Sequence, residues 1–403
     1  MSHKLLPSLG MHGAPTIYAD YQATTPVDPR VVKTMAPFWG ESFGNPHSND
    51  HIIGWQANKA VYEAASSIAA MIGADVDEII FTSGATEANN LALLGLARRA
   101  PTDRRQILVS ATEHKCVLAA ARALSEREGF TVETIPVNCE GLVDLNVLER
   151  RLTGSVLAVS VMAVNNEIGA IQDIPRIAEI LAPHDVPLHC DAAQAPCAID
   201  VSDLAVHAQL VSLSGHKMYG PQGIGTLYIR RDLQERLEPL IYGGGQQEGL
   251  RSGTTPVPLC VGMGAAAEII AATEAIEERK RVACQRDLFV RLLKRGHAFV
   301  TINGAVGDRR HPGNANIGFD GFRAQDILGA LQPQLAASTG AACASGIPEP
   351  SHVLRALGLT EAQSDASIRF SFGRFTTDDE IEKAGHLVLD ALNSLSCEPT
   401  KKL

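Results

Sequence analysis

Short strand-like runs alternate with helix-like segments between residues 79 and 229 of this chain. The runs at 79–82, 107–110 and 156–163 are rich in β-branched and other apolar residues, and each precedes a segment of helical periodicity. This alternation predicts βαβ units and a mostly parallel sheet that is covered by helices on both faces. We therefore predict an α/β fold with a ligand site at the carboxyl ends of the strands.

The residue composition and the pattern of predicted elements change after Gly253. Residues 259–299 are dominated by Ala, Ile, Glu and Arg, and the remainder mixes strand-like runs with helix-like segments. At 403 residues, of which 45% are hydrophobic, the chain is long enough for two domains. We predict a large domain over 20–268 and a smaller α+β domain formed by 1–19 and 269–403.

Charge and cysteine usage exclude several classes of protein. The formal net charge of −10 argues against a nucleic-acid-binding surface, because phosphate contacts need clustered Lys and Arg. No apolar run approaches the roughly 18 residues of a membrane span, and the apolar stretch near the N-terminus is too short for a signal peptide. The eight cysteines form no CxxC pair and no cluster with zinc spacing, so neither a metal site nor a disulfide framework is expected. We predict a cytoplasmic protein.

Lys217 stands where a surface lysine is not expected. It ends Ser214-Gly215-His216-Lys217, which follows the apolar run 208–213, a run typical of a buried strand. Such a lysine loses part of its hydration, which lowers its pKa and frees the amine to form a Schiff base. Asp191 ends another apolar run, 186–190. A Schiff-base lysine and a buried carboxylate are what pyridoxal phosphate (PLP) requires, although two unrelated polar residues at strand ends are the alternative.

Two segments of small residues are candidates for binding a phosphate. Ser83-Gly84-Ala85-Thr86-Glu87 lies between a predicted strand and a predicted helix, so Ala85 and Thr86 would meet an anion at the helix N-terminus. An ordinary N-cap formed with Thr86 and Glu87 is the alternative. The second segment, 251–255, includes Thr254 and would add a cation and hydroxyls to the same phosphate, but taken alone it is a plain turn.

Further polar residues follow other predicted strands. His114 is placed to stack on a flat ring and to act as an acid or base near neutral pH, although a lone histidine is more often structural. Asn165 and Asn166 bring two amides to the same edge, and Gln194 would face the same way as Asp191.

Cys343 is flanked almost entirely by Gly, Ala, Ser and Thr. Such a segment has little to pack, so we expect a mobile loop over 338–350. An exposed cysteine on a loop of this kind is a liability unless its reactivity is used. A small residue buried in a tight turn is the alternative.

These motifs and several others occur in a fixed chain order, namely Asp20-Tyr21-Gln22-Ala23-Thr24-Thr25-Pro26, Phe43-Gly44-Asn45-Pro46-His47-Ser48, Thr82-Ser83-Gly84-Ala85-Thr86-Glu87, Thr112-Glu113-His114-Lys115, Val164-Asn165-Asn166-Glu167-Ile168-Gly169, Ser214-Gly215-His216-Lys217, Arg251-Ser252-Gly253-Thr254 and Glu349-Pro350-Ser351-His352-Val353-Leu354-Arg355-Ala356-Leu357-Gly358. The pattern resembles the cysteine desulfurases of the NifS/IscS class, from about Tyr18 to Leu392. The 338–350 segment is similar to the longer cysteine loop of the IscS type rather than to that of the SufS type. The resemblance implies the fold-type I architecture of PLP-dependent transferases.

The resemblance also implies which residues hold PLP. Lys217 matches the lysine that binds the cofactor and later moves the substrate's Cα proton. Asp191 matches the carboxylate on the pyridinium nitrogen, and His114 the histidine that stacks on the ring. Gln194 matches the residue near the phenolate oxygen of the cofactor. The residues that match the set around the phosphate are Ala85, Thr86, Ser214 and His216, together with Thr254, which the neighbouring subunit of a homodimer donates.

By the same resemblance, Asn166 and Arg369 hold the carboxylate of L-cysteine, with Asn166 also near the cofactor. Cys343 matches the nucleophile that takes the substrate sulfur as a persulfide, which leaves alanine. A protein that accepts the sulfur is implied, and iron–sulfur assembly, tRNA thiolation and DNA phosphorothioation stay open as its pathway. The alternatives are a selenocysteine lyase or another PLP-dependent C–S lyase, an aminotransferase, and a sulfur-relay subunit that is active mainly within a complex.

Overall fold

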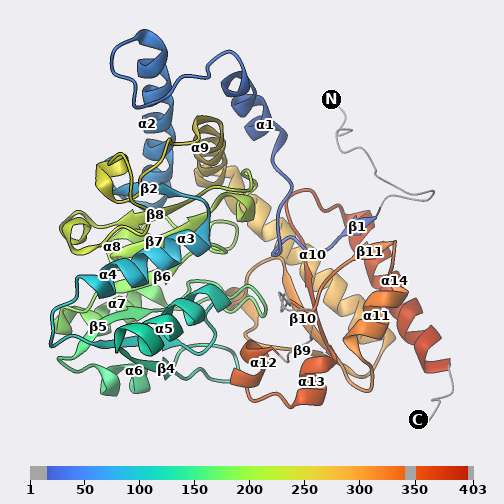
Figure 1. The fold of residues 1–403 in the computed structure, drawn as a ribbon. Helices are drawn as coiled ribbons and strands as arrows, with labels where there is room; N and C mark the ends of the chain where they lie inside the picture. The colour runs from blue at the N-terminus through green and yellow to red at the C-terminus, as the bar shows by residue number, and fades with distance from the viewer. Residues whose placement is uncertain (1–15, 341–350, 398–403) are drawn as a thin grey trace.

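The computed structural model describes residues 16–340 and 351–397. Within this part of the chain, a central sheet of seven strands is flanked by helices, and a smaller sheet lies beside it (Figure 1). The strands of the central sheet, in spatial order, are β2 (Ile79–Thr82), β8 (Gly225–Ile229), β7 (Leu210–Ser214), β6 (Leu188–Asp191), β5 (Val156–Ser160), β3 (Gln106–Ser110) and β4 (Thr131–Ile135).

Five neighbouring strands, β7, β6, β5, β3 and β4, run parallel. Strand β8 is antiparallel to both β7 and β2. The connection from β7 to β8, residues 215–224, is too short for the helical crossover that a parallel pair needs. The prediction of an α/β fold with a mostly parallel sheet is confirmed, and the antiparallel direction of β8, between β2 and β7, follows from this short connection.

Alternate residues of each strand face opposite layers of helices. Leu108 packs in one core, whereas Ile107 and Val109 pack in the other. The first core includes helices α2 (Ile52–Ile72), α6 (Leu145–Arg151), α7 (Ile174–Leu181) and α9 (Val257–Ala271). The second includes α3 (Ala85–Asn90), α4 (Leu96–Arg98) and α5 (Lys115–Glu128). Both faces of the sheet are therefore buried, which explains the nearly continuous apolar runs of its strands.

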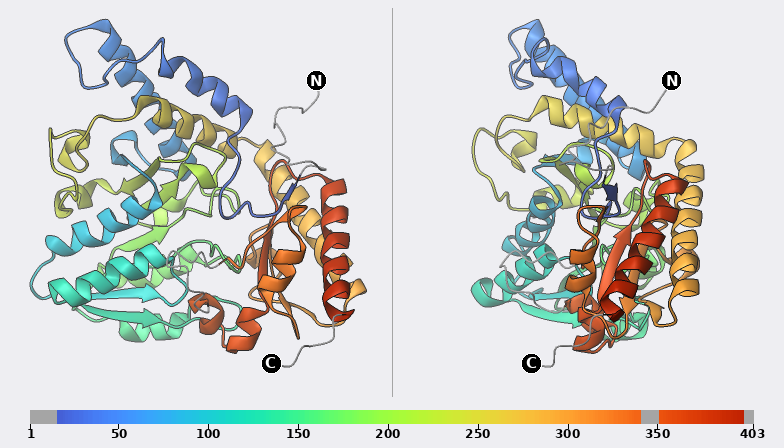
Figure 2. Two further views of the ribbon diagram at one scale, coloured as in Figure 1. Left: turned by 45° about the vertical axis from the view of Figure 1, so that its right-hand side comes forward. Right: turned by 90° about the vertical axis from the view of Figure 1, so that its right-hand side faces the viewer.

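A separate core lies in the C-terminal part of the chain, where Phe289, Phe319, Phe370 and Phe372 pack together. The antiparallel sheet there has the order β12 (Ser367–Ser371), β10 (Asn314–Phe319) and β9 (Val300–Ile302). Helices α10 (Glu274–Gly296) and α14 (Asp378–Cys397) lie side by side against it (Figure 2). Strand β1 (Ile17–Tyr18) joins this part by pairing with β11 (Leu335–Ala336). The domain boundaries over 1–19, 20–268 and 269–403 stay a prediction.

The shorter helices complete the list: α1 (Pro29–Met35), α8 (Leu204–His207), α11 (Ala324–Ala330), α12 (His352–Ala356) and α13 (Glu361–Asp365). The helix predicted over 86–98 begins at Ala85 and contains one π turn, Leu91–Gly95, between α3 and α4. Among the described residues, no single helix is long and apolar enough to cross a bilayer; the bent pair α9 and α10 meets the length and composition limits together but turns by 77° at its break.

Candidate active site

A cavity of about 570 Å³ opens at the carboxyl edge of the central sheet. It forms there because β3, β5, β6 and β7 are parallel, so the segments that follow them meet at one edge. Nine of the residues predicted to bind the cofactor line this cavity, namely Lys217, Asp191, Gln194, His114, Asn166, Ala85, Thr86, Ser214 and His216.

Two other predicted residues, both in the described part of the chain, do not line the cavity. Thr254 is exposed on the surface, and Arg369 lies in β12, behind Asn166. Cys343 lies outside the described residues, as does the rest of 341–350.

Lys217 ends a single 3-10 turn, Gly215–Lys217, that follows β7 directly. Its Nζ donates to the carbonyl oxygens of Gln22 and Ala23, both at 2.6 Å. Burial is the main cause that lowers the pKa of Lys217 to about 8, and the Arg369 cation acts in the same direction. A neutral amine, the form that reacts with an aldehyde, is therefore accessible to Lys217 near physiological pH.

Asp191 is buried at the end of β6 and is held by two donors. Asn89 Nδ2 donates to its Oδ2 at 2.7 Å, and the backbone N–H of Ala193 donates to its Oδ1 at 3.0 Å. These two donors fix the orientation of the Asp191 carboxylate at the wall of the cavity. Sequence reasoning missed Asn89. The signal was available, because Asn89 is a polar residue on the otherwise apolar face of the helix that begins at Ala85.

The start of α3 forms one wall of the cavity. Gly84 is its N-cap, with φ +148°, and no side chain caps the first N–H groups. The alternative of an N-cap formed with Thr86 and Glu87 is therefore wrong: Thr86 is the second helical residue, and Glu87 accepts from the N–H of Ser83 at 2.8 Å. An uncapped helix N-terminus leaves donors and positive potential for an anion.

No residue of the segment 251–255 lines this cavity within one chain. Arg251 Nε donates at 2.9 Å to Oε1 of Glu87, which does line the cavity, so the charge of Arg251 is paired with a carboxylate at the cavity wall. His216 does reach it, with Nδ1 3.0 Å from Thr24 Oγ1. Burial, assisted by the neighbouring Lys217, lowers the pKa of His216 to about 4, so the ring is neutral at physiological pH. It meets an anion as a hydrogen-bonding group rather than as a cation.

His114 is the N-cap of α5, and its Nδ1 accepts from the backbone N–H of Cys116 at 3.2 Å. The ring is exposed to the cavity, while the protein around it removes part of its hydration. This desolvation is the main cause that lowers the pKa of His114. The imidazole is thus neutral at physiological pH, as a ring that stacks on a cofactor and exchanges protons would be.

Arg369 lies just behind the wall of the cavity. Its Nη1 donates to the carbonyl of Asn166 at 2.7 Å, and its Nη2 lies 2.5 Å from Asp20 Oδ1. The third donor, Nε, is buried and has no partner in the described chain. A buried guanidinium with a free donor suits a carboxylate. The neighbouring Asn165 was expected at the same edge, but it is fully buried and binds Thr112 and the backbone of the 165–168 turn instead.

The residues present fit PLP. The uncapped start of α3, with Thr86 and Ser214 nearby, suits its phosphate, and Asp191 suits a protonated ring nitrogen. Lys217 is a desolvated amine in the same cavity, and no carboxylate binds its Nζ directly among the described residues.

Comparisons with known proteins agree with this arrangement. The family model described as Aminotransferase class-V matches residues 17–384. The proteins named cysteine desulfurase IscS from Rickettsia akari and Rickettsia prowazekii are each 46% identical over 379 residues, covering 94% of this chain and 92% of theirs. A solved NifS-like protein superposes with a TM-score of 0.87 at 33% identity, over 94% of this chain and all of its own. The solved structure of SspA in complex with cysteine gives a TM-score of 0.79 at 35% identity, over 90% of this chain and 100% of its own. The chain therefore belongs to the cysteine desulfurases, PLP-dependent enzymes of the class V aminotransferase family.

Proposed function

We propose that this enzyme converts L-cysteine to L-alanine and holds the sulfur as a persulfide on Cys343. The observation that carries the proposal is the shared cavity of Lys217, Asp191 and His114, with the Arg369 guanidinium directly behind Asn166. The solved relative SspA is in complex with cysteine, which supports cysteine as the substrate.

The site favours a substrate that carries both an amine and a carboxylate. Arg369 Nε is a buried donor for the carboxylate that has no partner among the described residues, and the same guanidinium binds the carbonyl of Asn166, which lines the cavity. Lys217, with a pKa of about 8, accepts the Cα proton as a neutral amine and returns it as a cation. PLP, when bound, supplies the electron sink that makes this proton acidic. Asp191 would hold the ring nitrogen of PLP in its protonated form, which the electron sink requires.

Both ends of the segment that contains Cys343 lie next to the substrate-binding pair. A Cβ built on Gly340 would come within 3.4 Å of Arg369 Cβ, and Ser351 Oγ donates to Glu167 Oε2 at 2.5 Å. The described residues on either side of 341–350 are thus anchored close to Asn166 and Arg369, which supports the assignment of Cys343 as the nucleophile.

In the proposed transfer, the Cys343 thiolate attacks the sulfur of L-cysteine. The new bond is S–S, the bond that breaks is Cβ–S, and the carbon skeleton takes up a proton at Cβ. The net change is enzyme thiol plus L-cysteine to enzyme persulfide plus L-alanine, with no outside oxidant or reductant.

The experiment that tests this compares the wild type, Cys343→Ala and Cys139→Ala with L-cysteine. Cys139 is exposed, so Cys139→Ala controls for loss of a thiol elsewhere. We expect alanine from the wild type and from Cys139→Ala, with an adduct of about 32 Da, one sulfur atom, on the Cys343 peptide. Cys343→Ala should bind PLP normally, as judged by absorbance, and produce neither alanine nor sulfide.

Equal alanine and sulfide from Cys343→Ala would overturn the persulfide mechanism and favour a C–S lyase. The same assay with L-selenocysteine tests the lyase alternative directly, because a selenocysteine lyase needs no protein persulfide. Accumulation of pyridoxamine phosphate with a keto acid would instead indicate an aminotransferase.

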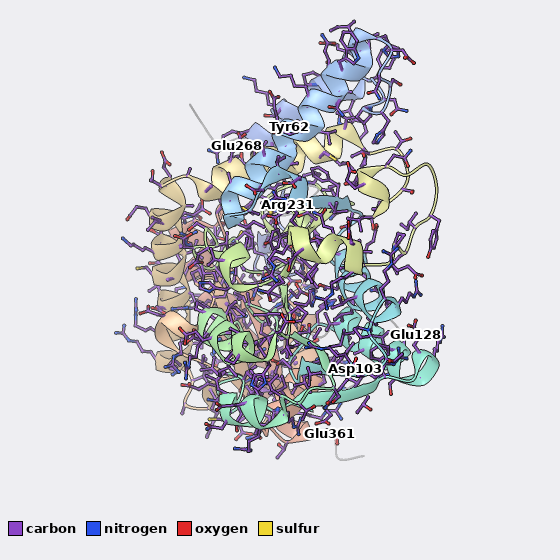
Figure 3. All side chains as sticks on the ribbon, turned by 90° about the vertical axis from the view of Figure 1, so that its left-hand side faces the viewer. Tyr62, Asp103, Glu128, Arg231, Glu268 and Glu361 are labelled. Carbon is purple, nitrogen blue, oxygen red and sulfur yellow. The ribbon has the colours of Figure 1, made fainter. Side chains whose placement is uncertain are left out.

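We also propose a homodimer, which an exposed apolar surface supports. Both tryptophans of the chain are more than half exposed, Trp39 at 65% and Trp55 at 54%. They belong to an apolar surface on and around α1 and α2. These helices project beyond the central sheet, and Figure 3 shows Tyr62 on the surface of α2. Monomeric proteins rarely expose so many large apolar side chains together. The other members of this apolar surface are Val32, Phe43, Ile52, Ile53 and Tyr62.

The proposed dimer gives Thr254 a role. Its neighbour Thr255 lies against the 45–47 turn, with Oγ1 3.4 Å from His47 Nε2, so Thr254 borders the apolar surface. Thr254 is exposed and does not line the cavity of its own chain. A second copy docked on this surface would receive Thr254 at its phosphate site.

The sulfur acceptor is proposed to be a protein of the cytoplasm. The name IscS of the Rickettsia relatives favours an iron–sulfur scaffold as this acceptor. Free cysteines at six described positions suit a reducing compartment. Alanine production measured with and without a purified scaffold protein would tell whether sulfur transfer depends on it.

A further inference from the structure

Cys116 lines the cavity, and the functions described above leave it without a role. It lies in the first turn of α5, two residues after His114. Its Sγ is 3.0 Å from His114 Nδ1 and 3.2 Å from Asn89 Nδ2. The same Asn89 nitrogen donates to Asp191 Oδ2 at 2.7 Å. A continuous chain of hydrogen-bonding groups therefore joins Asp191 to His114 through Asn89 and Cys116.

The direction of each hydrogen bond in this chain follows from the chemistry of its groups. The Asp191 carboxylate only accepts, so Asn89 must turn its NH₂ group toward Asp191; the flipped amide would set Oδ1 against a carboxylate oxygen. The two N–H groups of Asn89 are then used by Asp191 and by the Cys116 sulfur. The Cys116 sulfur accepts from Asn89 and from the Thr86 side chain, and its own S–H donates to His114 Nδ1, 3.0 Å away.

His114 Nδ1 also accepts the backbone N–H of Cys116, which is the helix-capping bond of α5. Two donors thus converge on Nδ1. A nitrogen that accepts two hydrogen bonds carries no proton, so the single proton of the neutral ring is on Nε2.

We propose that Cys116 is a positioning residue, through which Asp191 and Asn89 hold His114 as the Nε2–H tautomer. The role of His114 in catalysis rests on the proposed function, whereas the hydrogen-bonded chain does not depend on it. The consequence is that His114 presents a hydrogen-bond donor, not a base, at Nε2. Asp191, which would set the charge of the PLP ring, would then also fix which nitrogen of the stacking His114 ring carries the proton.

Four charged or titratable groups face His114 from the surrounding elements. Asp191 on β6 and Glu167 after β5 favour its charged form. Lys217 after β7 and His352 on α12 oppose it. All four remain when Cys116 is replaced, so a change in the titration of His114 would report on the thiol.

The test is ¹⁵N NMR of histidine-labelled protein without PLP, so that its readout does not depend on the loaded enzyme. His114→Gln assigns the His114 signals. In the wild type we expect the Nε2–H tautomer. In Cys116→Ala, which loses one donor to Nδ1, the titration midpoint of His114 should rise by roughly half a unit to one unit. Cys116→Ser keeps a donor and should stay close to the wild type, and Cys139→Ser, an exposed site, should leave the midpoint unchanged.

An Nδ1–H tautomer in the wild type would overturn the proposal, even if Cys116→Ala does not fold. An unchanged His114 midpoint in a folded Cys116→Ala protein would overturn it as well. If the titration midpoint of His114 rises by the same amount in Cys116→Ser, water that enters beside His114 causes the change rather than loss of the donor to Nδ1. That result would also overturn the proposal. Failure of the proposed function would appear separately, as alanine formation that does not depend on Cys343.

Discussion

The guanidinium of Arg369 and the carboxylate of Asp20 form an ion pair of 2.5 Å beside the candidate active site. The two residues are 349 positions apart, and both side chains are largely buried. Ser338 Oγ donates to the same Asp20 oxygen at 3.1 Å, and Arg369 Nε has no partner in the described chain. Arg369 is therefore held in place by Asp20 while one donor stays free for a substrate carboxylate.

Arg369→Lys tests this arrangement. A lysine keeps the charge but loses the planar fork of donors, so it cannot bind Asp20, Asn166 and a carboxylate at once. We expect KM for L-cysteine to rise about a hundredfold with a smaller change in kcat, because binding of the carboxylate is lost. Steady-state alanine formation measures both constants. An unchanged KM would mean that another residue holds the substrate carboxylate.

Asp20→Asn should change the pH dependence of PLP attachment to the apoprotein. Attachment needs the neutral amine of Lys217, so its rate should rise with pH through a midpoint at about 8. Asp20 raises the pKa of Lys217 and Arg369 lowers it. Removing the Asp20 charge therefore moves the midpoint to lower pH.

The rate at which the absorbance of the bound cofactor appears, measured at a series of pH values from about 6 to about 10, gives this midpoint. Asp103→Asn is the matched control, because Asp103 is exposed at the surface of the molecule (Figure 3). A midpoint that Asp20→Asn leaves in place or raises would show that Asp20 does not influence Lys217.

The sequence predicted those parts of the site that depend on strand order. Asp191 ends its strand, Lys217 and His114 follow theirs within one turn, and the carboxyl ends of parallel strands meet at one edge. Their meeting in one cavity could thus be predicted without coordinates.

Contacts set by side-chain direction could not be predicted in this way. Asn165 and Asn166 are neighbours with the same side-chain chemistry, yet Asn165 folds back onto its own turn and only Asn166 faces the cavity. The same holds for the backbone of Gln22 and Ala23, which binds Lys217 from nearly two hundred positions away. Such contacts depend on the path that each turn takes and on how the segment at 22–23 packs against the turn that ends at Lys217, which no local pattern encodes.

Glu113 should make the stability of the fold depend on pH. The side chain is fully buried, with Oε1 accepting from the N–H of Met162 at 2.6 Å and Oε2 without a partner among the described residues. Burial, and secondarily the Asp191 charge, hold the pKa of Glu113 well above its usual range. The folded state therefore keeps a proton that the unfolded state loses above about pH 4.5, so this group costs stability as pH rises.

Glu113→Gln removes this titration while it keeps the shape of the neutral carboxyl. We expect the variant to gain stability relative to the wild type between pH 5 and pH 8, measured as the midpoint of urea unfolding. Glu126→Gln, an exposed site on the same helix α5, should show no such pH-dependent difference. A Glu113→Gln difference that is the same at both pH values would mean that Glu113 is ionised in the folded protein.

The proposed dimer predicts that a charge on the apolar surface of α1 and α2 separates the subunits. Trp55→Glu places a carboxylate at a residue that is 54% exposed in one chain and would be buried between two. We expect light scattering to give the mass of a dimer for the wild type and of a monomer for Trp55→Glu. Phe299→Glu, at an exposed residue of the smaller part of the chain, should remain a dimer. The Trp55→Glu monomer should also bind PLP more weakly, because Thr254 of a second copy can no longer reach the phosphate. A wild-type protein that is a monomer would contradict the assignment of this surface to the dimer interface. A Trp55→Glu protein that remains a dimer with unchanged PLP affinity would contradict it as well.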